Sequence, residues 1–474
     1  MKEYDVIAFG TGSAMNIVSA AFGVNPNLRV AVIEKDRVGG ICLTRGCIPS
    51  KMILYQAETA YHVREAHKFG VHVDGYTVDP MAALSRARRL IEEESSMIER
   101  SLIEHPNIDL YKGVGEFVDE YTVSVNGVEI RADKILLCTG SRPFIPPIPG
   151  LREAGFVTSD DFFFMDKVPD KWVVIGGGYV GLELGFFLAM AGRKVTLLEM
   201  KPRIAPLEEP EVSAVLQKKL GEVMDIRTRH KVVEVEKRGD RKVVIAEGPD
   251  GGTLEFEADE ILVAVGRRSN SDLTKPEKTG VKTDERGWII TNEYLETTKP
   301  GIWACGDANG KYMFKHKANY ESQIVFHNAF LGRRVKADYH AVPHAIFTYP
   351  EVAAVGMKQE EAQRKHRILV GYYKYVDTAK GEAMMADEDY FVKVIVEEDT
   401  YRILGAHIVG PYASILIQEI VNLMYTDDES AVPVFRGMHI HPALSEVVER
   451  AFFSLAPPDH WHVHGTHIHH VHHH

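Results

Sequence analysis

The chain has 474 residues, of which 45% are hydrophobic and 26% charged, and its formal net charge is −12. This length and composition predict a globular protein of roughly two to four domains. The negative charge argues against nucleic-acid binding, and no apolar run reaches the roughly 20 residues that cross a bilayer. The first residues show no signal-peptide pattern, and four cysteines are too few for a secreted disulfide framework. We therefore expect a cytoplasmic protein with no membrane or nucleic-acid partner.

The N-terminal segment has the pattern of a dinucleotide-binding unit. Residues 6–9 predict a buried parallel strand, residues 17–23 a helix and residues 30–34 the next strand. The turn between the first strand and the helix contains Gly10 and Gly12, and Glu34 ends the second strand. Such a turn lets backbone N–H groups approach a pyrophosphate, and an acid at the next strand end can bind ribose hydroxyls. Met15 stands where a third glycine is expected, so this motif alone is a weak signal.

Two cysteines, Cys42 and Cys47, follow this unit in the run GGICLTRGCIPSK of residues 39–51. Their spacing is too long for a CxxC motif, and there is no second close pair to complete a zinc site. A redox-active dithiol beside a bound flavin explains the placement. The alternative is two buried apolar cysteines, which the flanking Gly-Gly and Pro-Ser-Lys do not favour. We expect this segment to open a long helix that continues to about His67.

The pattern then repeats. Residues 80–105 predict a helix and residues 135–138 a buried strand that ends at Thr139-Gly140, and the Pro-rich run 143–150 indicates a domain boundary. A second strand–turn–helix–strand unit follows, with strands at 172–175 and 194–199 and a helix at 182–191. Its fingerprint residues are Gly176, Gly178, Gly181 and Glu199. Because a carboxylate at the last position repels a 2′-phosphate, NAD is favoured over NADP, although Lys201 and Arg203 lie close by.

The remaining chain completes these units and adds a third. Residues 261–266 close the second unit at Gly266, and residues 301–307 resemble a return to the first. From about residue 344 the composition changes to alternating strands, such as 390–396, with helices expected near 412–425 and 443–453. Cys138 and Cys305 end apolar strands, and we expect both to be buried as small hydrophobic residues.

Taken in order, these motifs resemble the pyridine nucleotide–disulfide oxidoreductase family over residues 1–455. The resemblance implies an α/β fold with two Rossmann-like domains, one for FAD and one for NAD, and a C-terminal α+β dimerisation domain. The implied boundaries are 1–150 and 271–343 for the two segments of the FAD domain, 151–270 for the NAD domain, 344–457 for the dimerisation domain and 458–474 for a His-rich tail.

The resemblance also implies roles for residues that bind cofactors. Glu34 would hold the FAD adenosine ribose, and Asp307 the ribityl or phosphate region. Lys51 would lie near flavin N5, paired with Glu183, and Tyr179 would cover the nicotinamide pocket. The simpler alternatives are a surface salt bridge for Lys51 and core filling for Tyr179. The residues placed beside these are Gly10, Gly12, Thr139, Gly140 and Gly306 for FAD, and Gly176, Gly178, Gly181, Glu199 and Gly266 for NAD.

In this resemblance the dithiol and a distant histidine form the catalytic site. Cys47 would be the flavin-side thiol and Cys42 the interchange thiol that attacks the substrate disulfide. His441, in the His-Pro segment with Glu446 five residues later, would move the proton, and Glu446 would orient its ring. The family places this segment against the partner subunit's dithiol, which implies a homodimer. His439 does not match the catalytic position and is expected to be structural.

Within the family, the pattern is most similar to the dihydrolipoamide dehydrogenase branch, which acts on lipoyl groups of 2-oxoacid dehydrogenase or glycine-cleavage complexes. Residues 48–51, Glu199 and residues 441–446 carry this similarity. The absence of any cysteine after Cys305 argues against mercuric reductases. Mycothione and glutathione reductases prefer NADPH, which Glu199 does not favour. They remain the alternative, because Thr44, Arg45 and Lys315 depart from the lipoamide pattern.

The tail from residue 460 onward is rich in histidine, and imidazole binds Ni, Cu and Zn readily. A metal-binding or metal-reducing flavoprotein is therefore a further reading. An appended purification tag, or a tail that binds metal incidentally, is the alternative. No metal-site residue is assigned from the sequence.

Overall fold

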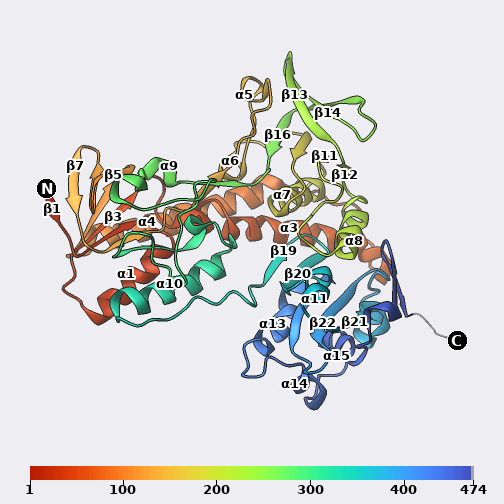
Figure 1. Cartoon of the computed structure of the whole chain (residues 1–474). Coiled ribbons are helices and arrows are strands. Elements are labelled where there is room, and N and C mark those ends of the chain that lie inside the picture. Colours follow the sequence, from red (N-terminus) through yellow and green to blue (C-terminus); the bar gives the residue numbers. More distant parts are fainter. Residues whose placement is uncertain (471–474) are drawn as a thin grey trace.

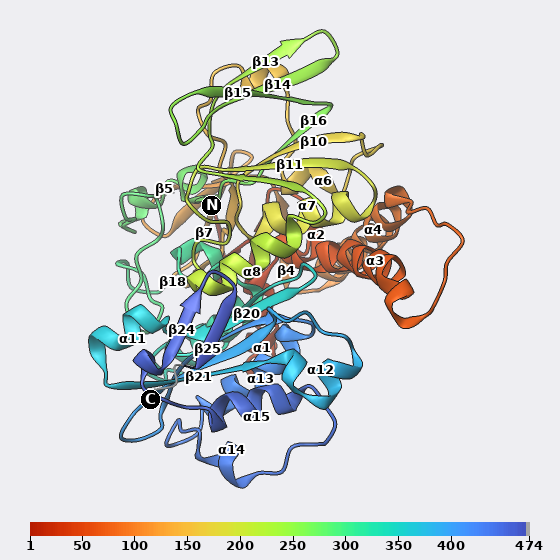
Figure 2. The same ribbon diagram turned by 90° about the vertical axis from the view of Figure 1, so that its right-hand side faces the viewer.

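The computed structural model describes residues 1–470, and Figures 1 and 2 show it from two sides. Two parallel sheets and one antiparallel sheet organise the chain, each with its own helices. The N-terminal unit lies at the left of Figure 1, the second parallel sheet at the upper right, and the C-terminal antiparallel unit below it in blue.

The first sheet is a parallel sheet assembled from distant parts of the chain. Its strand order is β18-β8-β2-β3-β4, and β2 and β3 are buried along their whole length because they are runs of apolar residues. The helices α1 and α10 pack against each other beside this sheet. The strands are β2 (Val6–Phe9), β3 (Val30–Glu34), β4 (Ile108–Lys112), β8 (Ile135–Leu137) and β18 (Ile302–Ala304), and the helices are α1 (Ser13–Val24) and α10 (Lys315–Phe330).

The cysteine segment forms two helices where the sequence predicts one continuous helix. Helix α2 (Gly40–Thr44) carries Cys42, and α3 (Cys47–Glu65) begins at the second cysteine. Between them Gly46 has a non-helical backbone, with φ −132° and ψ −124°, and a Cβ there would lie only 2.8 Å from the carbonyl oxygen of Ile41. The helix predicted to reach about His67 therefore starts at Cys47 and gives way to a short 3₁₀ turn after Glu65. It packs against α4 (Pro80–Glu104) and α7 (Tyr179–Met190).

The second sheet repeats the first on a smaller scale. Its order is β12-β11-β10-β16, and all its pairs are parallel. Helix α7 is buried on almost every side, because it lies between this sheet and α3. It begins three residues before the predicted start at residue 182. The elements are β10 (Lys171–Ile175), β11 (Lys194–Glu199), β12 (Asp225–Thr228), β16 (Glu260–Val263) and α8 (Pro210–Leu220), with an antiparallel extension of β13 (Lys231–Arg238), β14 (Arg241–Glu247) and β15 (Thr253–Ala258).

The third sheet is antiparallel and has the order β19-β20-β23-β22-β21. Strand β23 is fully buried rather than alternating, because helices α13 and α15 contact the sheet and the start of α8 also packs against it. Lys393 and His407 lie opposite each other in register, and the Lys393 ammonium is 3.2 Å from the Glu209 carboxylate beside α8. The elements are β19 (His344–Ile346), β20 (Glu351–Gly356), β21 (Ile368–Lys374), β22 (Phe391–Glu397), β23 (Ile403–Gly410), α13 (Ala413–Leu423) and α15 (Ser445–Phe453).

The His-rich tail forms a hairpin that the sequence analysis did not predict. Its strands, β24 (Trp461–His464) and β25 (His467–His470), pair in antiparallel register. The indole N–H of Trp461 donates a hydrogen bond of 2.8 Å to the Val370 carbonyl, so the hairpin is fixed to β21. The rest of the tail, residues 471–474, lies outside the described residues.

Shorter elements connect these units. They are β1 (Lys2–Glu3), β5 (Gly115–Asp119), β6 (Thr122–Val125), β7 (Val128–Arg131), β9 (Ser141–Pro143), β17 (Arg267–Ser269), α5 (Leu151–Ala154), α6 (Ser159–Phe162), α9 (Ser271–Thr274), α11 (Gln359–Lys365), α12 (Ala379–Ala383) and α14 (Val432–Arg436). Within residues 1–470, no helix combines the length and apolar character needed to span a bilayer.

Candidate active site

A cavity of about 1040 Å³ connects the first sheet, helix α7 and the antiparallel unit. It contains most of the residues that the sequence assigns to a flavin site. The predicted residues on its wall are Gly10, Gly12, Glu34, Cys42, Cys47, Lys51, Thr139, Gly140, Tyr179, Glu183, Gly306 and Asp307.

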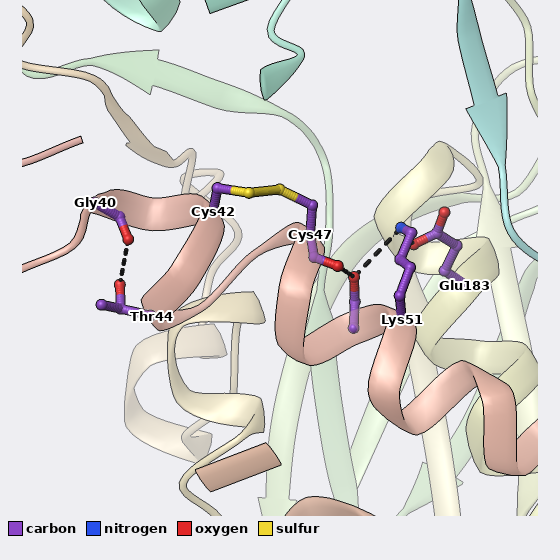
Figure 3. The surroundings of a disulfide bond; sticks show 7 residues. Gly40, Cys42, Thr44, Cys47, Lys51 and Glu183 are labelled. Carbon is purple, nitrogen blue, oxygen red and sulfur yellow. Dashed lines mark hydrogen bonds and ion pairs between the residues drawn. A yellow bond between two sulfur atoms is a disulfide. The ribbon is translucent and has the colours of Figure 1, made fainter. Parts of the chain in front are cut away.

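The two cysteines of this wall form a disulfide (Figure 3), and their Cα atoms are 4.9 Å apart. Cys42 lies in α2 and Cys47 opens α3, so the helix break at Gly46 is what lets the two sulfurs meet. Both residues are half-buried. The bond therefore sits at the cavity surface, where a cofactor on one side and a substrate on the other can reach it.

One helical turn after Cys47, the Lys51 ammonium donates a hydrogen bond of 2.9 Å to Glu183 (Figure 3). The side chain of Glu183 is only 10% exposed, and its second oxygen accepts the backbone N–H of Phe347 at 2.9 Å. Three separate segments thus hold this carboxylate in place. A buried carboxylate needs such partners, because an unpaired charge there is costly.

The first glycine turn has the chemistry of a phosphate site. Helix α1 has no side-chain cap at Gly12, so the N–H groups of its first turn have no side-chain partner. Gly10 has a φ of +88°, and a Cβ there would lie 2.5 Å from the Cys138 carbonyl oxygen. Across the turn, a Cβ on Gly40 would lie 2.6 Å from the Cα of Gly12. Only glycine permits these approaches, and they shape a narrow cradle on the cavity wall.

At the side of this cradle, Glu34 is buried with one oxygen accepting both the N–H (3.0 Å) and the hydroxyl (2.6 Å) of Thr11. Further along the wall, Asp307 accepts a 2.6 Å hydrogen bond from the Ser141 hydroxyl. The buried hydroxyl oxygen of Thr139 has no hydrogen-bond partner in the protein and lines the cavity. The Thr139 hydroxyl, the separate carboxylates of Glu34 and Asp307, and the N-terminus of α1 fit the ribose, ribityl and phosphate parts of FAD.

The sequence analysis missed Arg267, which lies against these residues. Its Nε donates a 2.7 Å hydrogen bond to the Ser141 hydroxyl and is 3.9 Å from Asp307. Burial lowers the pKa of this guanidinium, although the charges of Asp307 and Asp160 oppose the shift. A positive charge on this wall suits an anionic cofactor. The only sequence signal was its position directly after Gly266 at the end of the second unit.

The second glycine turn lies outside the wall of the main cavity, as do Glu199 and Gly266. Gly176 has a φ of +113°, and a Cβ on Gly181 would lie 2.1 Å from the Gly176 carbonyl oxygen. Helix α7 has no side-chain cap at Gly178. The carboxylate of Glu199 accepts the N–H of Gly177 at 2.8 Å. The geometry is that of a dinucleotide turn, and Gly266 ends a nearby loop, with a φ of +113°.

Tyr179 connects the second turn to the main cavity. Its hydroxyl donates a 2.8 Å hydrogen bond to Glu208, which also bonds His344 at 2.7 Å. The tyrosine ring stacks on His344 and on Phe314, with centroids 5.6 Å and 6.2 Å away. Burial and the neighbouring carboxylate raise the pKa of the Tyr179 phenol, so it remains a hydrogen-bond donor. The side chain stands at the cavity wall and also packs against the apolar core cluster.

The histidine dyad predicted near the C-terminus is present but lies apart from the dithiol. His441 Nδ1 is 2.9 Å from a Glu446 oxygen, and the imidazole is 71% exposed. A hydrogen bond with His441 lowers the pKa of the Glu446 carboxyl. His441 is not among the described residues on the cavity wall. His439 instead bonds Glu419 at 2.7 Å and is largely buried.

The departures from the lipoamide pattern have structural partners of their own. The Thr44 hydroxyl donates a 2.9 Å hydrogen bond to the Gly40 carbonyl within α2 (Figure 3). Arg45 pairs with Asp36 at 2.9 Å, on the loop that follows Glu34. Lys315 lines the cavity at the start of α10, and burial lowers its pKa.

Among residues 1–470, no group of three or more His, Cys, Asp or Glu side chains is arranged to hold a metal ion.

Comparison with known proteins agrees with this geometry. Residues 4–322 match the family described as pyridine nucleotide-disulphide oxidoreductase, and residues 342–452 match its dimerisation domain. The chain is 34% identical to dihydrolipoyl dehydrogenase of Chlamydia trachomatis, with 97% of this chain and 98% of the relative covered. It is also 34% identical to mycothione reductase of Mycobacterium tuberculosis, with 96% of this chain and 100% of the relative covered.

A solved structure is similar as well. The Cu(II) complex of the HOCl-induced flavoprotein disulfide reductase RclA from Escherichia coli superposes with a TM-score of 0.84 at 25% identity, covering 96% of this chain and 99% of that one. These matches, over residues 4–322 and 342–452 and at 34% identity along nearly the whole chain, show that the chain belongs to the pyridine nucleotide–disulfide oxidoreductase family.

Proposed function

We propose that this chain is an FAD-dependent enzyme that moves two electrons between NAD(H) and a dithiol, with dihydrolipoyl groups as its substrate. The observation that carries the proposal is the Cys42–Cys47 disulfide on the wall of the cavity that also holds the first glycine turn. When bound there, FAD supplies the two-electron relay between nicotinamide and disulfide.

The cysteines carry out the exchange with substrate. A substrate thiolate attacks the sulfur of Cys42, which forms a mixed disulfide and releases Cys47 as a thiolate. The second substrate thiolate then attacks the substrate sulfur of that mixed disulfide, which closes the substrate disulfide and frees Cys42. Lys51, fixed by Glu183, places a positive charge one turn from the Cys47 thiolate. His441 accepts one of the two protons that the substrate thiols lose, the freed Cys42 thiolate takes up the other, and Glu446 orients the imidazole ring.

The proposal favours NAD over NADP and a lipoyl substrate over mycothiol or glutathione disulfides. Glu199 supports NAD, because a carboxylate at the end of this strand would repel a 2′-phosphate, and the N–H of Gly177 holds it beside the second turn. Thr44 and Arg45 depart from the lipoamide pattern; the Thr44 hydroxyl is engaged within its own helix, and Arg45 pairs with Asp36 while lining the cavity. A lipoyl substrate would be supplied by a 2-oxoacid dehydrogenase or glycine-cleavage complex. A cytoplasmic location is part of this proposal and rests on cysteine usage.

We further propose that each active site is shared between two subunits. The match to a dimerisation domain supports a homodimer. The exposed His441 is flanked by Ile440 and Met438, whose side chains are 77% and 99% exposed. Apolar side chains so exposed suit a surface that a second copy covers. In the dimer, His441 of the partner subunit would face the Cys42–Cys47 pair.

Mixed dimers test the shared site. Cys42→Ser and His441→Gln are each expected to abolish disulfide turnover when both subunits carry the same change. A purified heterodimer with one change per subunit would keep one intact site and recover about half of the wild-type activity, because the unchanged Cys42 of one chain meets the unchanged His441 of the other. An inactive heterodimer of two folded, flavin-bearing subunits would contradict the shared site.

A substrate panel tests the reaction itself. The purified protein should show flavin absorbance. It should oxidise NADH faster with lipoamide than with mycothiol, glutathione or coenzyme A disulfides, and with lipoamide it should oxidise NADH faster than NADPH. Faster turnover of another disulfide would refute the lipoyl substrate. Cys42→Ser should abolish disulfide reduction and retain flavin, whereas loss of the flavin would show that this cysteine is structural.

Metal binding by the hairpin is a second candidate function, although its described histidines are not already arranged to hold an ion and would have to converge on one. Its register pairs His462 with His469 and His464 with His467, and residues that alternate along paired strands share one face. These four side chains are exposed, whereas Ile468 on the opposite face is buried. RclA, which is similar in structure, is described as a Cu(II) complex.

The hairpin can be tested without deleting the tail. Deletion would also remove Trp461 and its hydrogen bond to Val370, so replacing the four histidines by asparagine is the cleaner change. We expect that variant to lose Cu(II) binding in calorimetry while keeping lipoamide turnover. Unchanged Cu(II) affinity would refute the hairpin site.

A further inference from the structure

Two cysteines outside the proposed exchange site meet on the wall of the same cavity. The sulfur atoms of Cys138 and Cys305 are 3.3 Å apart. Strands β8 and β18 are parallel neighbours with Leu137 opposite Ala304, and one more residue on each strand brings the two cysteines side by side. Neighbouring strands are about 4.8 Å apart, within the range of Cα separations that a disulfide spans. Little movement is needed to join these sulfurs.

The two sulfurs differ in surroundings. Cys305 is fully buried, and Cys138 is half-buried and open to the cavity. The hydrogen bond with Cys138, and burial, raise the pKa of the Cys305 thiol, and either sulfur can be the donor of that bond. Lys315 lines the same cavity and interacts electrostatically with both sulfurs. A nearby ammonium favours a thiolate, which is the reactive form of cysteine.

We propose that Cys138 and Cys305 form a second oxidisable dithiol, which hydroperoxides convert to a disulfide. The Cys138 sulfur attacks the outer oxygen of the hydroperoxide, the O–O bond breaks and the proton of the Cys138 thiol passes to the leaving oxygen, so Cys138 becomes a sulfenic acid and an alcohol or water leaves. The Cys305 sulfur then attacks the sulfenic sulfur, the S–S bond forms and water leaves. The two thiols lose two electrons in all, and the hydroperoxide is reduced by two electrons.

The location gives the oxidation a consequence, which rests on the proposed flavin function. Cys138 leads directly into Thr139-Gly140, and Cys305 leads into Gly306-Asp307. Forming the S–S bond brings the sulfurs from 3.3 Å to about 2.05 Å, and this movement takes place on the cavity wall directly beside these flavin residues. The Cys138 carbonyl also contacts Gly10 closely enough that a Cβ there would lie 2.5 Å away. We expect oxidised protein to release flavin several-fold faster than reduced protein.

Thiol mapping of the holoenzyme tests the dithiol directly. The chain has four cysteines, two of which form the Cys42–Cys47 disulfide, so Cys138 and Cys305 are the two free thiols. After hydrogen peroxide treatment, alkylation and peptide mass mapping should show both free thiols lost and a Cys138–Cys305 cross-link that dithiothreitol reverses. Cys138→Ser should abolish the cross-link and protect Cys305 from oxidation. Two thiols that remain alkylatable, or separate over-oxidation without a cross-link, would overturn the proposal.

Two further measurements separate the parts of this inference. Lys315→Met should slow cross-link formation several-fold, and Lys311→Met is the matched control, because Lys311 is exposed and lies off the cavity wall. An equal rate in wild type and Lys315→Met would refute the role of the ammonium. Flavin release is followed by fluorescence before and after oxidation. A cross-link that leaves the release rate unchanged would overturn the link to the cofactor, whereas protein purified without flavin would count against the proposed function instead.

Discussion

The two glycine turns of this molecule hold their acids by the same device. Glu34 accepts the N–H of Thr11 at 3.0 Å, and Glu199 accepts the N–H of Gly177 at 2.8 Å, each from the residue between the first two glycines. The second oxygen of each acid accepts the N–H two residues further along, at 2.9 Å and 2.7 Å. The repeat therefore extends from the motif to the hydrogen bonds that fix each carboxylate at its strand end.

The turns differ in what covers them. Gly12 lies against Gly40 of the cysteine segment, whereas nothing lies within 4 Å of a Cβ built on Gly178. At the third position, Gly181 lies so close to Gly176 that no side chain fits, but Met15 is accommodated beside the apolar cluster around α1. The first turn is closed over by the dithiol segment, which suits a resident cofactor. The second is open, which suits a nucleotide that enters and leaves.

The largest expected effect is at the third glycine of the open turn. In Gly181→Ala the new Cβ would lie 2.1 Å from the Gly176 carbonyl oxygen, so the start of α7 must shift away from the strand. We expect NADH-dependent turnover to fall by roughly a hundredfold or more, since small displacements of bound reactants have effects of that size. Flavin content should be unchanged, because the first turn is untouched.

Gly185→Ala is the matched control in the same helix. The nearest atom to its Cβ would be the Met224 sulfur at 3.6 Å, an ordinary contact. Alanine also favours helix over glycine by about 1 kcal/mol. Equal NADH kinetics in Gly181→Ala and Gly185→Ala would show that the third glycine is not needed for the second turn.

The next effect concerns the choice of nucleotide. Glu199→Gln removes the negative charge beside the second turn, so the ratio of NADPH to NADH specificity, measured as kcat/KM, should rise about tenfold to a hundredfold, or about 1.4–2.8 kcal/mol. Glu234→Gln, an exposed carboxylate on the extension of the same sheet, should leave the ratio unchanged. A ratio unaffected by Glu199→Gln would remove the main support for NAD.

A smaller effect is expected at Thr11, the residue that distinguishes the closed turn. Its hydroxyl donates to Glu34 at 2.6 Å and accepts the N–H of Gly39 at 2.9 Å, which ties the acid to the dithiol segment. Gly177, at the matching position of the second turn, has no side chain. Thr11→Ala should weaken flavin binding roughly tenfold, in line with about 1–2 kcal/mol for such hydrogen bonds. Thr11→Ser should restore it, and equal flavin affinity in wild type and Thr11→Ala would contradict the tie.

These contacts also show what could be predicted from the sequence. Periodicity and glycine spacing located both turns and both acids, because these features are local. The pairing of Lys51 with Glu183 came from the family resemblance. The contact of Cys138 with Cys305, the position of Arg267 beside Asp307 and the network of Tyr179 depend on strands that meet only after folding. A local pattern carries no signal for such contacts.

Local signals also failed in two places. The break between the cysteine helices lies at Gly46, which packs closely against the Ile41 carbonyl, although a glycine between two helical segments was a cue. The tail hairpin was not expected, because histidine has no marked strand preference and the anchoring partner of Trp461 lies in distant β21.

The smallest expected effect separates the Tyr179 network from catalysis. Burial alone would raise the pKa of the Glu208 carboxyl, but hydrogen bonds from His344 and Tyr179 outweigh burial and hold it below its ordinary value. An acid with a lowered pKa adds stability above its unfolded-state pKa, and that stability is lost as the pH falls through its folded-state pKa. Tyr179→Phe removes one donor while His344 remains, so the variant should be less stable by about 1 kcal/mol at neutral pH. The deficit should shrink in acid, where the carboxyl is protonated in both proteins. Thermal unfolding at several pH values measures this stability difference. Tyr76→Phe, at an exposed tyrosine, is the control. A stability difference that does not change with pH would assign the effect to ring packing instead of the Glu208 charge.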